Sequence, residues 1–323
     1  MALSTVIKSL AATLVAAALV GGGFILGHDH QTSTQKPLTS AAPYSLLDPS
    51  VSDSATHPEI INFDPLRQNL KLYLAGLNVS HSLYFEYLPN GVNIRDGDDN
   101  TSQAASLLKT PLVMDLYKLA EQGKISLDNV STVNPVDLDA DPVYGNPTHL
   151  RIGDKLTLRQ AAQITLKYSD NTTLSLIKDR IIPIIDSSSD SFRSLDLTLT
   201  FGSLATNQQV AISSRSYASI LKCLYYACFN SPDDSTQIIT DLFGSSELNR
   251  LVAGVPTDIK VAHKVGSGST SAQSDCGIIY DPGKPYLVCL MLFNIPSTTN
   301  VNPYFQHVSQ MIYDYVNGAT PDP

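Results

Sequence analysis

Apolar positions at helical spacing mark where the folded part of the chain begins. In residues 61–77, Phe63, Leu66 and Leu70 and the apolar residues after them recur three or four positions apart. This spacing places apolar side chains on one face of a helix. Further helices are predicted over 158–168, 172–182 and 214–229, and a last one over 303–316. Residues 124–248 as a whole are predicted to be mainly helical, with long polar loops.

Shorter apolar runs predict strands. Two are expected over 83–88 and 92–95, joined by Pro89-Asn90-Gly91, a strong hairpin signal. Three more are expected over 258–264, 277–280 and 286–293. Two strands, a helical insertion, three strands and a helix predict an α+β fold. We expect an antiparallel five-stranded sheet flanked by helices, an inserted all-α lobe at about 124–248, and a cleft between them.

The N-terminal region has a different pattern. Ser9 to Gly27 is an uncharged, mostly apolar run with Lys8 before it, long enough to span a bilayer as a helix. We expect residues 1–27 to be a transmembrane anchor or a signal peptide, and favour the uncleaved anchor. Residues 28–57 are rich in Ser, Thr and Pro and are expected to form a flexible linker. The folded body is expected over 58–323, outside the cytoplasm, tethered or secreted.

The amino-acid composition excludes some classes of binding partner. The 323 residues are 43% hydrophobic and 16% charged, with a formal net charge of −9. This acidic balance argues against nucleic acid and against an anionic membrane surface as partners.

The cysteines are expected to be buried free thiols. Cys223 and Cys228 lie five apart in a predicted helix, on different faces, which disfavours a disulfide between them. Cys276 and Cys289 flank a predicted hairpin turn. If Tyr280 faces Tyr286, the two cysteines point to opposite faces of the sheet.

Candidate chemistry starts at Ser106-Leu107-Leu108-Lys109, where a predicted helix begins that Gly123 is expected to stop. Residues three apart share a helix face, so the Lys109 amine can reach the Ser106 hydroxyl. A serine becomes a strong nucleophile when a neighbouring base takes its proton. The four-residue pattern is common by chance, so it needs support from elsewhere in the chain.

Two further motifs supply that support. Ser169-Asp170-Asn171 lies between two predicted helices, where Ser169 can pass a proton and Asn171 can accept and donate hydrogen bonds. Taken alone, this segment is better explained as a helix cap. Lys264-Val265-Gly266-Ser267-Gly268 ends a predicted strand, where the lysine can hold an anion and the glycines allow close approach of a substrate backbone. Alone, it is an ordinary strand end.

In this order, about 60 and 95 residues apart, the three motifs resemble those of the penicillin-recognising serine hydrolases, class A β-lactamases in particular. The resemblance covers about residues 60–318. It implies that Ser106 is the acylated nucleophile, Lys109 its general base and Ser169 a proton relay. It also implies that the substrate is bound by Asn171, Lys264, Gly266 and Ser267, with the backbone N–H groups of Ser106 and Ser267 as oxyanion hole.

The chain departs from the family pattern in two places. Val265 stands where the family usually has Thr or Ser, and it cannot donate a hydrogen bond to a substrate carboxylate, although Ser267 could substitute. Class A β-lactamases also use a glutamate between the second and third motifs to activate water. From Lys124 to Ser246 there is no glutamate, and Asp186, Asp190 and Asp196 lack the usual flanking residues. Acylation chemistry is therefore expected, whereas fast deacylation of penicillins is not.

We therefore expect an exported serine acyl hydrolase or transferase that forms an acyl-enzyme at Ser106. Its substrate would be a peptidoglycan-type peptide or another amide or ester. Two alternatives stay open: a β-lactamase, and a catalytically weak module that binds in the cell envelope. We expect a monomer that contacts the membrane through its N-terminal helix and needs no cofactor or metal. His263, beside Lys264, is expected to be structural because alternation turns it to the other side of its strand.

Overall fold

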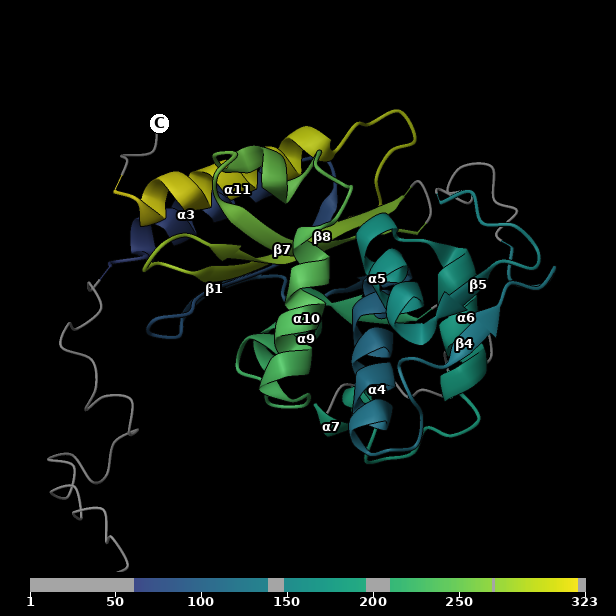
Figure 1. Ribbon diagram of the computed structural model, residues 1–323. Helices are drawn as coiled ribbons and strands as arrows, with labels where there is room; N and C mark the ends of the chain where they lie inside the picture. Colours follow the sequence, from purple (N-terminus) through teal and green to yellow (C-terminus); the bar gives the residue numbers. More distant parts are fainter. Residues whose placement is uncertain (1–60, 139–147, 196–209, 269–270, 319–323) are drawn as a thin grey trace, which may run out of the picture. The chain divides into compact units, whose positions relative to one another are not determined.

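An antiparallel sheet with helices on both sides forms the framework of the protein (Figure 1). The computed structural model describes residues 61–138, 148–195, 210–268 and 271–318, all within one compact unit, Ile60–Pro323. The strand order is β2-β1-β9-β8-β7. The bounds are β1 Ser80–Tyr87, β2 Val92–Asp96, β7 Lys260–Ser267, β8 Ala272–Tyr280 and β9 Tyr286–Phe293. The predicted α+β class with a five-stranded antiparallel sheet is confirmed.

Two helices from opposite ends of the unit cover one face of the sheet. These are α3 (Asp64–Ala75) and α11 (Asn302–Val316), which lie side by side in Figure 1. Leu66 and Leu70 of α3 and Phe305 of α11 are fully buried against Phe85 and other sheet residues. Burying each such side chain contributes roughly 1.5–3 kcal/mol. The helical spacing in the sequence therefore serves to seal this face.

The other face is covered by a larger group of helices. They are α4 (Lys109–Glu121), α5 (Leu158–Tyr168), α6 (Asn171–Ile181), α7 (Ser191–Ser194), α9 (Ser214–Tyr225) and α10 (Pro232–Phe243). Helix α9 packs on β9 and β1, and α10 packs on β7, the edge strand. Helix α4 is buried along most of its length. The residues that begin α4 are therefore held between the sheet and the other helices.

Several boundaries differ from the predicted ones. Helix α5 and strand β9 match their predicted ranges, whereas the helix predicted over 214–229 ends at Tyr225. Four three-residue strands were not predicted, because such short strands show no alternation. They form two pairs, β3 (Thr101–Gln103) with β6 (Ala211–Ser213) and β4 (Val130–Thr132) with β5 (Lys155–Thr157). Two short 3₁₀ helices, η1 (Ala105–Leu108) and η2 (Leu251–Gly254), complete the described elements.

The expectation of free thiols is wrong for both pairs of cysteines. Cys223 is joined to Cys228 and Cys276 to Cys289. Cys228 lies beyond the end of α9, and Ala227 before it takes a left-handed φ of 49°, which turns the chain back toward the helix. The helical projection that separated the first pair therefore does not apply.

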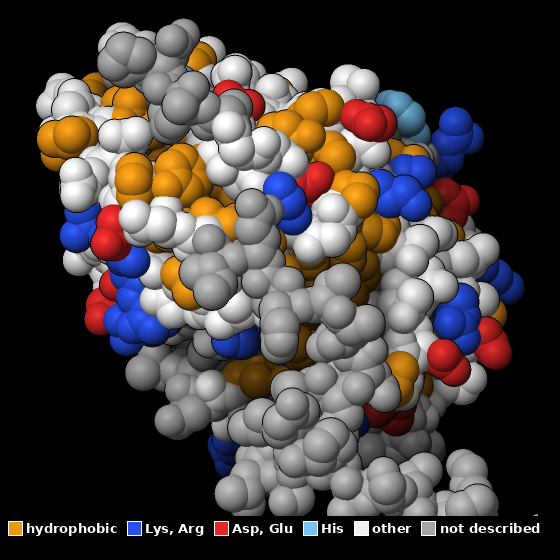
Figure 2. All heavy atoms as spheres, turned by 90° about the vertical axis from the view of Figure 1, so that its left-hand side faces the viewer, with side chains coloured by type: hydrophobic (Ala, Val, Ile, Leu, Met, Phe, Trp, Pro, Cys, Tyr) orange, Lys and Arg blue, Asp and Glu red, His pale blue; other side chains and the backbone are white. Residues whose placement is uncertain are grey.

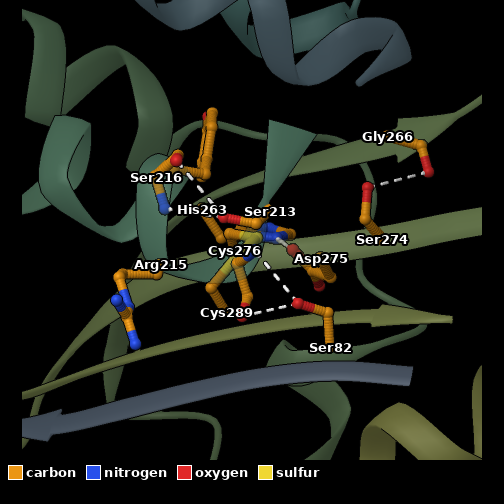
Figure 3. Close-up of a disulfide and its surroundings, with 12 residues drawn as sticks. Ser82, Ser213, Arg215, Ser216, His263, Gly266, Ser274, Asp275, Cys276 and Cys289 are labelled. Atoms are coloured by element: carbon orange, nitrogen blue, oxygen red, sulfur yellow. Dashed lines mark hydrogen bonds and ion pairs between the residues drawn. A yellow bond between two sulfur atoms is a disulfide. The ribbon is translucent and has the colours of Figure 1, made fainter. Parts of the chain in front are cut away.

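The second pair was misplaced by a one-residue error in register. The structure pairs Ile279, not Tyr280, with Tyr286, so Cys276 lies directly opposite Cys289. Because side chains alternate along a strand, a shift of one residue moves a side chain to the other face. Figure 3 shows this disulfide between neighbouring strands, with His263 and Asp275 alongside.

The surface carries both signs of charge. Figure 2 shows one face of the molecule, on which acidic and basic side chains lie interspersed and hydrophobic side chains reach the surface between them. Within the residues that the structure describes, no helix has the length and apolar character needed to cross a membrane. The predicted anchor over 1–27 and the predicted linker over 28–57 lie outside the described residues.

Candidate active site

Ser106 is presented by the short helix that leads into α4. It is the second residue of η1, and Ala105 before it has a φ of 47°, in the left-handed region that alanine rarely adopts. Lys109, the first residue of α4, is only 2% exposed. Its Nζ donates a hydrogen bond to Ser106 Oγ at 3.1 Å. The i, i+3 spacing therefore brings the amine onto the hydroxyl, as the sequence predicted.

Ser169 lies at the end of α5 and contacts the same amine. With a φ of 54° it takes the left-handed conformation that ends many helices. This turn directs both its carbonyl oxygen and its hydroxyl toward Lys109, whose Nζ lies 2.5 Å and 3.2 Å from them. Ser169 is thus held in place by the helix end itself.

The two residues that follow Ser169 make different kinds of contact. Asp170 is the N-cap of α6, where its carboxylate accepts a hydrogen bond from the Thr173 backbone N–H at 2.7 Å. Asn171, the next residue, accepts a hydrogen bond from Lys109 Nζ through Oδ1 at 2.6 Å. The helix-cap interpretation is therefore correct for Asp170, while Asn171 lies in the cluster around Lys109.

Lys264 approaches Ser169 from the sheet. It lies on β7 and is fully buried, and its Nζ donates to Ser169 Oγ at 2.9 Å. Burial lowers the pKa of the Lys264 amine to about 8, although the carboxylates of Asp275 and Glu247 act in the opposite direction. The hydroxyl of Ser169 is thus bracketed by two amines, one from α4 and one from β7.

Gly266 and Ser267 continue β7 past Lys264. A Cβ on Gly266 would come within 2.3 Å of Ser274 Oγ and 3.0 Å of the Ala104 carbonyl oxygen, so only glycine fits there. Ser267 donates to Gln273 Oε1 at 2.8 Å and accepts from Arg250 Nη2 at 3.1 Å. The segment Lys264–Gly268 therefore packs closely against the residues around η1, and Ser267 follows at the end of β7.

A cavity of about 400 Å³ opens between these elements. It is lined by Gln103, Ala105, Ser106, Lys109, Tyr168, Ser169, Asn171, Leu174, Ser246, Glu247, Val265, Ser267 and Gly268. Five of the seven predicted site residues thus reach one cavity. Lys264 is not in the lining, but it donates a hydrogen bond to Ser169, which is. Gly266 packs against the residues around η1 rather than lining the cavity.

The sequence analysis did not predict two charged residues that lie at this site. Arg250 lies just before η2 and donates to the Ser267 hydroxyl and to the Ser274 carbonyl, the latter at 2.7 Å. Glu247 is exposed and lines the cavity. The interval without glutamate ends at Ser246, so Glu247 lies one residue beyond it. No sequence motif marks either residue, and only the fold brings them to the third motif.

The aspartates considered as substitutes for the family glutamate do not line this cavity. Asp186 is exposed and bonded to Lys124 at 2.5 Å, and this contact holds the pKa of its carboxyl below the usual range. Asp190 caps α7 by accepting from the Arg193 backbone N–H. Asp196 lies outside the described residues.

His263 belongs to a separate buried pair. It is 1% exposed, and its Nδ1 lies 2.9 Å from Asp275 Oδ1. Burial alone would raise the pKa of the Asp275 carboxyl, but the His263 ring, the Arg250 charge and the Leu251 backbone N–H together hold that pKa below its usual value. The structural interpretation of His263 is confirmed. Among the described residues, no group of three His, Cys, Asp or Glu side chains is placed to hold a metal ion.

Chemically, the cavity contains the parts of an acyl-transfer site. A hydroxyl, two amines and a second hydroxyl form one continuous set of hydrogen bonds from Ser106 through Lys109 and Ser169 to Lys264. Such a chain can take a proton from an attacking hydroxyl and deliver it to a leaving atom.

Comparison with known proteins agrees with this geometry. A family model described as the Beta-lactamase enzyme family matches residues 65–316. A search among curated proteins finds no match. Among solved structures, PBP-A, in a mutant form described as an acyl-enzyme complex with penicillin G, is 20% identical with a TM-score of 0.69. The match covers 78% of this chain and 96% of that one.

Two bacterial enzymes are similar to the same degree. A β-lactamase from Sphaerobacter thermophilus is 21% identical with a TM-score of 0.68, over 81% of this chain and 100% of that one. A β-lactamase from Chitinophaga pinensis is 19% identical with a TM-score of 0.68, over 78% of this chain and 99% of that one. At these identities the likeness shows a shared fold.

Proposed function

The chain belongs to the β-lactamase enzyme family and is a serine hydrolase, and from that premise we propose that it works through an acyl-enzyme at Ser106. The observation that carries the proposal is the position of Lys109. Its amine lies within hydrogen-bond distance of Ser106 Oγ, Ser169 Oγ and Asn171 Oδ1 at one cavity.

In the proposed reaction Lys109 accepts the proton of Ser106 as Oγ attacks a carbonyl carbon. The proton passes through Ser169 to the leaving nitrogen or oxygen, and Lys264 stabilises negative charge that develops beside Ser169. The backbone N–H groups of Ser106 and Ser267 stabilise the oxyanion, since both residues line the cavity. Asn171 orients the amide of the substrate.

The substrate is proposed to carry a carboxylate near the scissile bond. The Val265 side chain cannot donate to it, but the Ser267 hydroxyl can, if it turns its proton from Gln273 to the substrate while it still accepts from Arg250. The guanidinium behind Ser267 supplies the positive potential that binding a carboxylate needs. A peptidoglycan-type peptide or a penicillin has such a group. We also propose that the enzyme acts outside the cytoplasm, tethered through residues 1–27.

Intact mass measured over time after exposure to a fluorescent penicillin and to a fluorophosphonate tests the proposal. We expect one covalent adduct that is absent in Ser106→Ala, with slow loss of the penicillin adduct. If the folded protein shows no adduct with either probe, the proposal is wrong. Rapid return to the unmodified mass with penicillin would instead favour β-lactamase activity.

A further inference from the structure

Glu247 is a carboxylate in the cavity that the acyl-transfer steps do not use. It is the acidic member among the described residues that line the cavity with Ser106 and Ser267. It is exposed, so its carboxylate can meet a substrate without first breaking a buried contact. No hydrogen bond or ion pair joins that carboxylate to another described residue.

The backbone around Glu247 is held against the end of α5. The Ser246 N–H donates to the Lys167 carbonyl oxygen at 2.9 Å, and the Glu247 N–H faces Ser245 Oγ at 3.4 Å. Residue 247 is therefore fixed beside Tyr168 and Ser169, the residues that end α5. The position of the charge along the cavity wall follows from the fold.

Two positively charged residues belong to the same part of the site as this carboxylate. Its charge raises the pKa of Lys264, which donates to Ser169. Arg250, three residues after Glu247, donates to Ser267. Because Ser169 is proposed to protonate the leaving group, residues gathered around Ser169 and Ser267 face that part of the substrate. This side of the cavity thus offers positive charge for a carboxylate and, beside it, Glu247 for a cation.

We propose that Glu247 is a specificity-determining residue that selects substrates whose leaving group carries an ammonium or guanidinium group as well as a carboxylate. A basic amino acid at the C-terminal side of the scissile amide has this chemistry. The inference rests on the proposed function. In that reaction the C–N bond breaks, the acyl carbon bonds to Ser106 Oγ, and the Ser106 proton goes to the leaving nitrogen. Glu247 binds the side chain of the departing residue and exchanges no proton.

The test uses full-length protein and peptides that differ in one group. The peptides share their acyl part and end in lysine or in norleucine, each with both configurations at the terminal residue. The measured quantity is the concentration of peptide that halves the rate of fluorophosphonate labelling at Ser106, which reports binding with or without turnover. We expect the lysine peptide to protect at a concentration roughly fivefold lower than the norleucine peptide, the size typical of an exposed charge pair.

Matched variants assign the effect. Glu247→Gln should remove the preference for lysine, Glu247→Lys should reverse it, and Asp258→Asn should leave it unchanged, because Asp258 is an exposed carboxylate that does not line the cavity. Equal protection by both peptides, protection by neither, or a preference that survives in Glu247→Gln would overturn the inference. Absence of labelling in the untreated parent protein would instead contradict the proposed function, so the two failures are distinguishable.

Discussion

Strand β7 carries two buried polar residues side by side, and they contact different partners. Lys264 points to Ser169 at the cavity, whereas His263 points to the other face of the sheet and pairs with Asp275. Both side chains are at most 1% exposed. The degree of burial therefore does not separate the proposed catalytic residue from the structural one. The difference lies in the partner, which is a hydroxyl that lines a cavity in one case and a sealed carboxylate in the other.

Substitutions at the cavity should change the rate of reaction at Ser106 more than the free energy of unfolding. Lys109→Ala removes the proposed base, and we expect labelling of Ser106 by a fluorophosphonate to slow by about 10³-fold. The free energy of unfolding should change little, because the hydrogen bonds that this amine makes are offset by the cost of burying it. The labelling rate is measured by quenching the reaction at successive times, and the free energy of unfolding is measured by urea denaturation. Labelling within tenfold of the parent rate would exclude Lys109 as the base.

The sealed side should behave in the opposite way. His263→Ala leaves Asp275 as a buried carboxylate without its ring partner, which typically costs about 3 kcal/mol. Urea denaturation should show this loss, and the labelling rate of the folded fraction should stay within a few fold. His307→Ala, at an exposed position where the ring lies 4.5 Å from that of Tyr73, is the matched control and should cost about 1 kcal/mol or less. Equal stabilities of the two variants would show that the buried pair contributes nothing.

Replacing the disulfide between Cys276 and Cys289 tests whether a group on the cavity face of the sheet affects activity by its position alone. Cys276 is directly opposite Lys264 in the β7–β8 register, yet both cysteines are fully buried in the core. Replacing both by Ala should cost about 3 kcal/mol in unfolding free energy and leave the labelling rate within twofold. Replacing Cys223 and Cys228, which close a shorter loop, should cost less. A large loss of labelling in the first variant would show that the core disulfide positions Lys264.

The smallest expected effect links the two faces through charge. Because the pKa of Lys264 lies at about 8, we expect labelling to fall as the pH rises through 8 and the amine loses its charge. Asp275 raises that pKa, so Asp275→Asn should move the alkaline limb down by about one pH unit. A limb that stays in place would show that the sealed pair does not influence the site.

The same titration predicts a change in stability, with a sign that can be worked out. Between about pH 8 and the ordinary lysine value of 10.5, the unfolded chain binds more protons at this residue than the folded protein does. Its contribution to the free energy of unfolding therefore increases with pH across that window. Urea denaturation at several pH values, with Lys264→Met as the control that lacks the group, isolates this contribution.

The sequence predicted those parts of the fold and site that depend on local spacing. The i, i+3 pair at Ser106 and Lys109, helix α5 and the hairpin at Gly91 all follow from residues close together in the chain. Features that depend on where separate segments meet were missed. The register of β8 against β9 decides the cysteine pairing, and the loop after α10 brings Glu247 and Arg250 to the cavity.

Ala105 illustrates what such a site requires of the rest of the protein. Its left-handed φ is a conformation that L-residues disfavour by roughly 1–2 kcal/mol, and it comes directly before Ser106, the proposed nucleophile. The packing of η1 against β7 must supply that energy every time the chain folds. A change at residue 105 that relaxed the backbone could raise thermal stability and at the same time turn the Ser106 hydroxyl away from Lys109. Selection for stability alone would therefore select against the enzyme at this position.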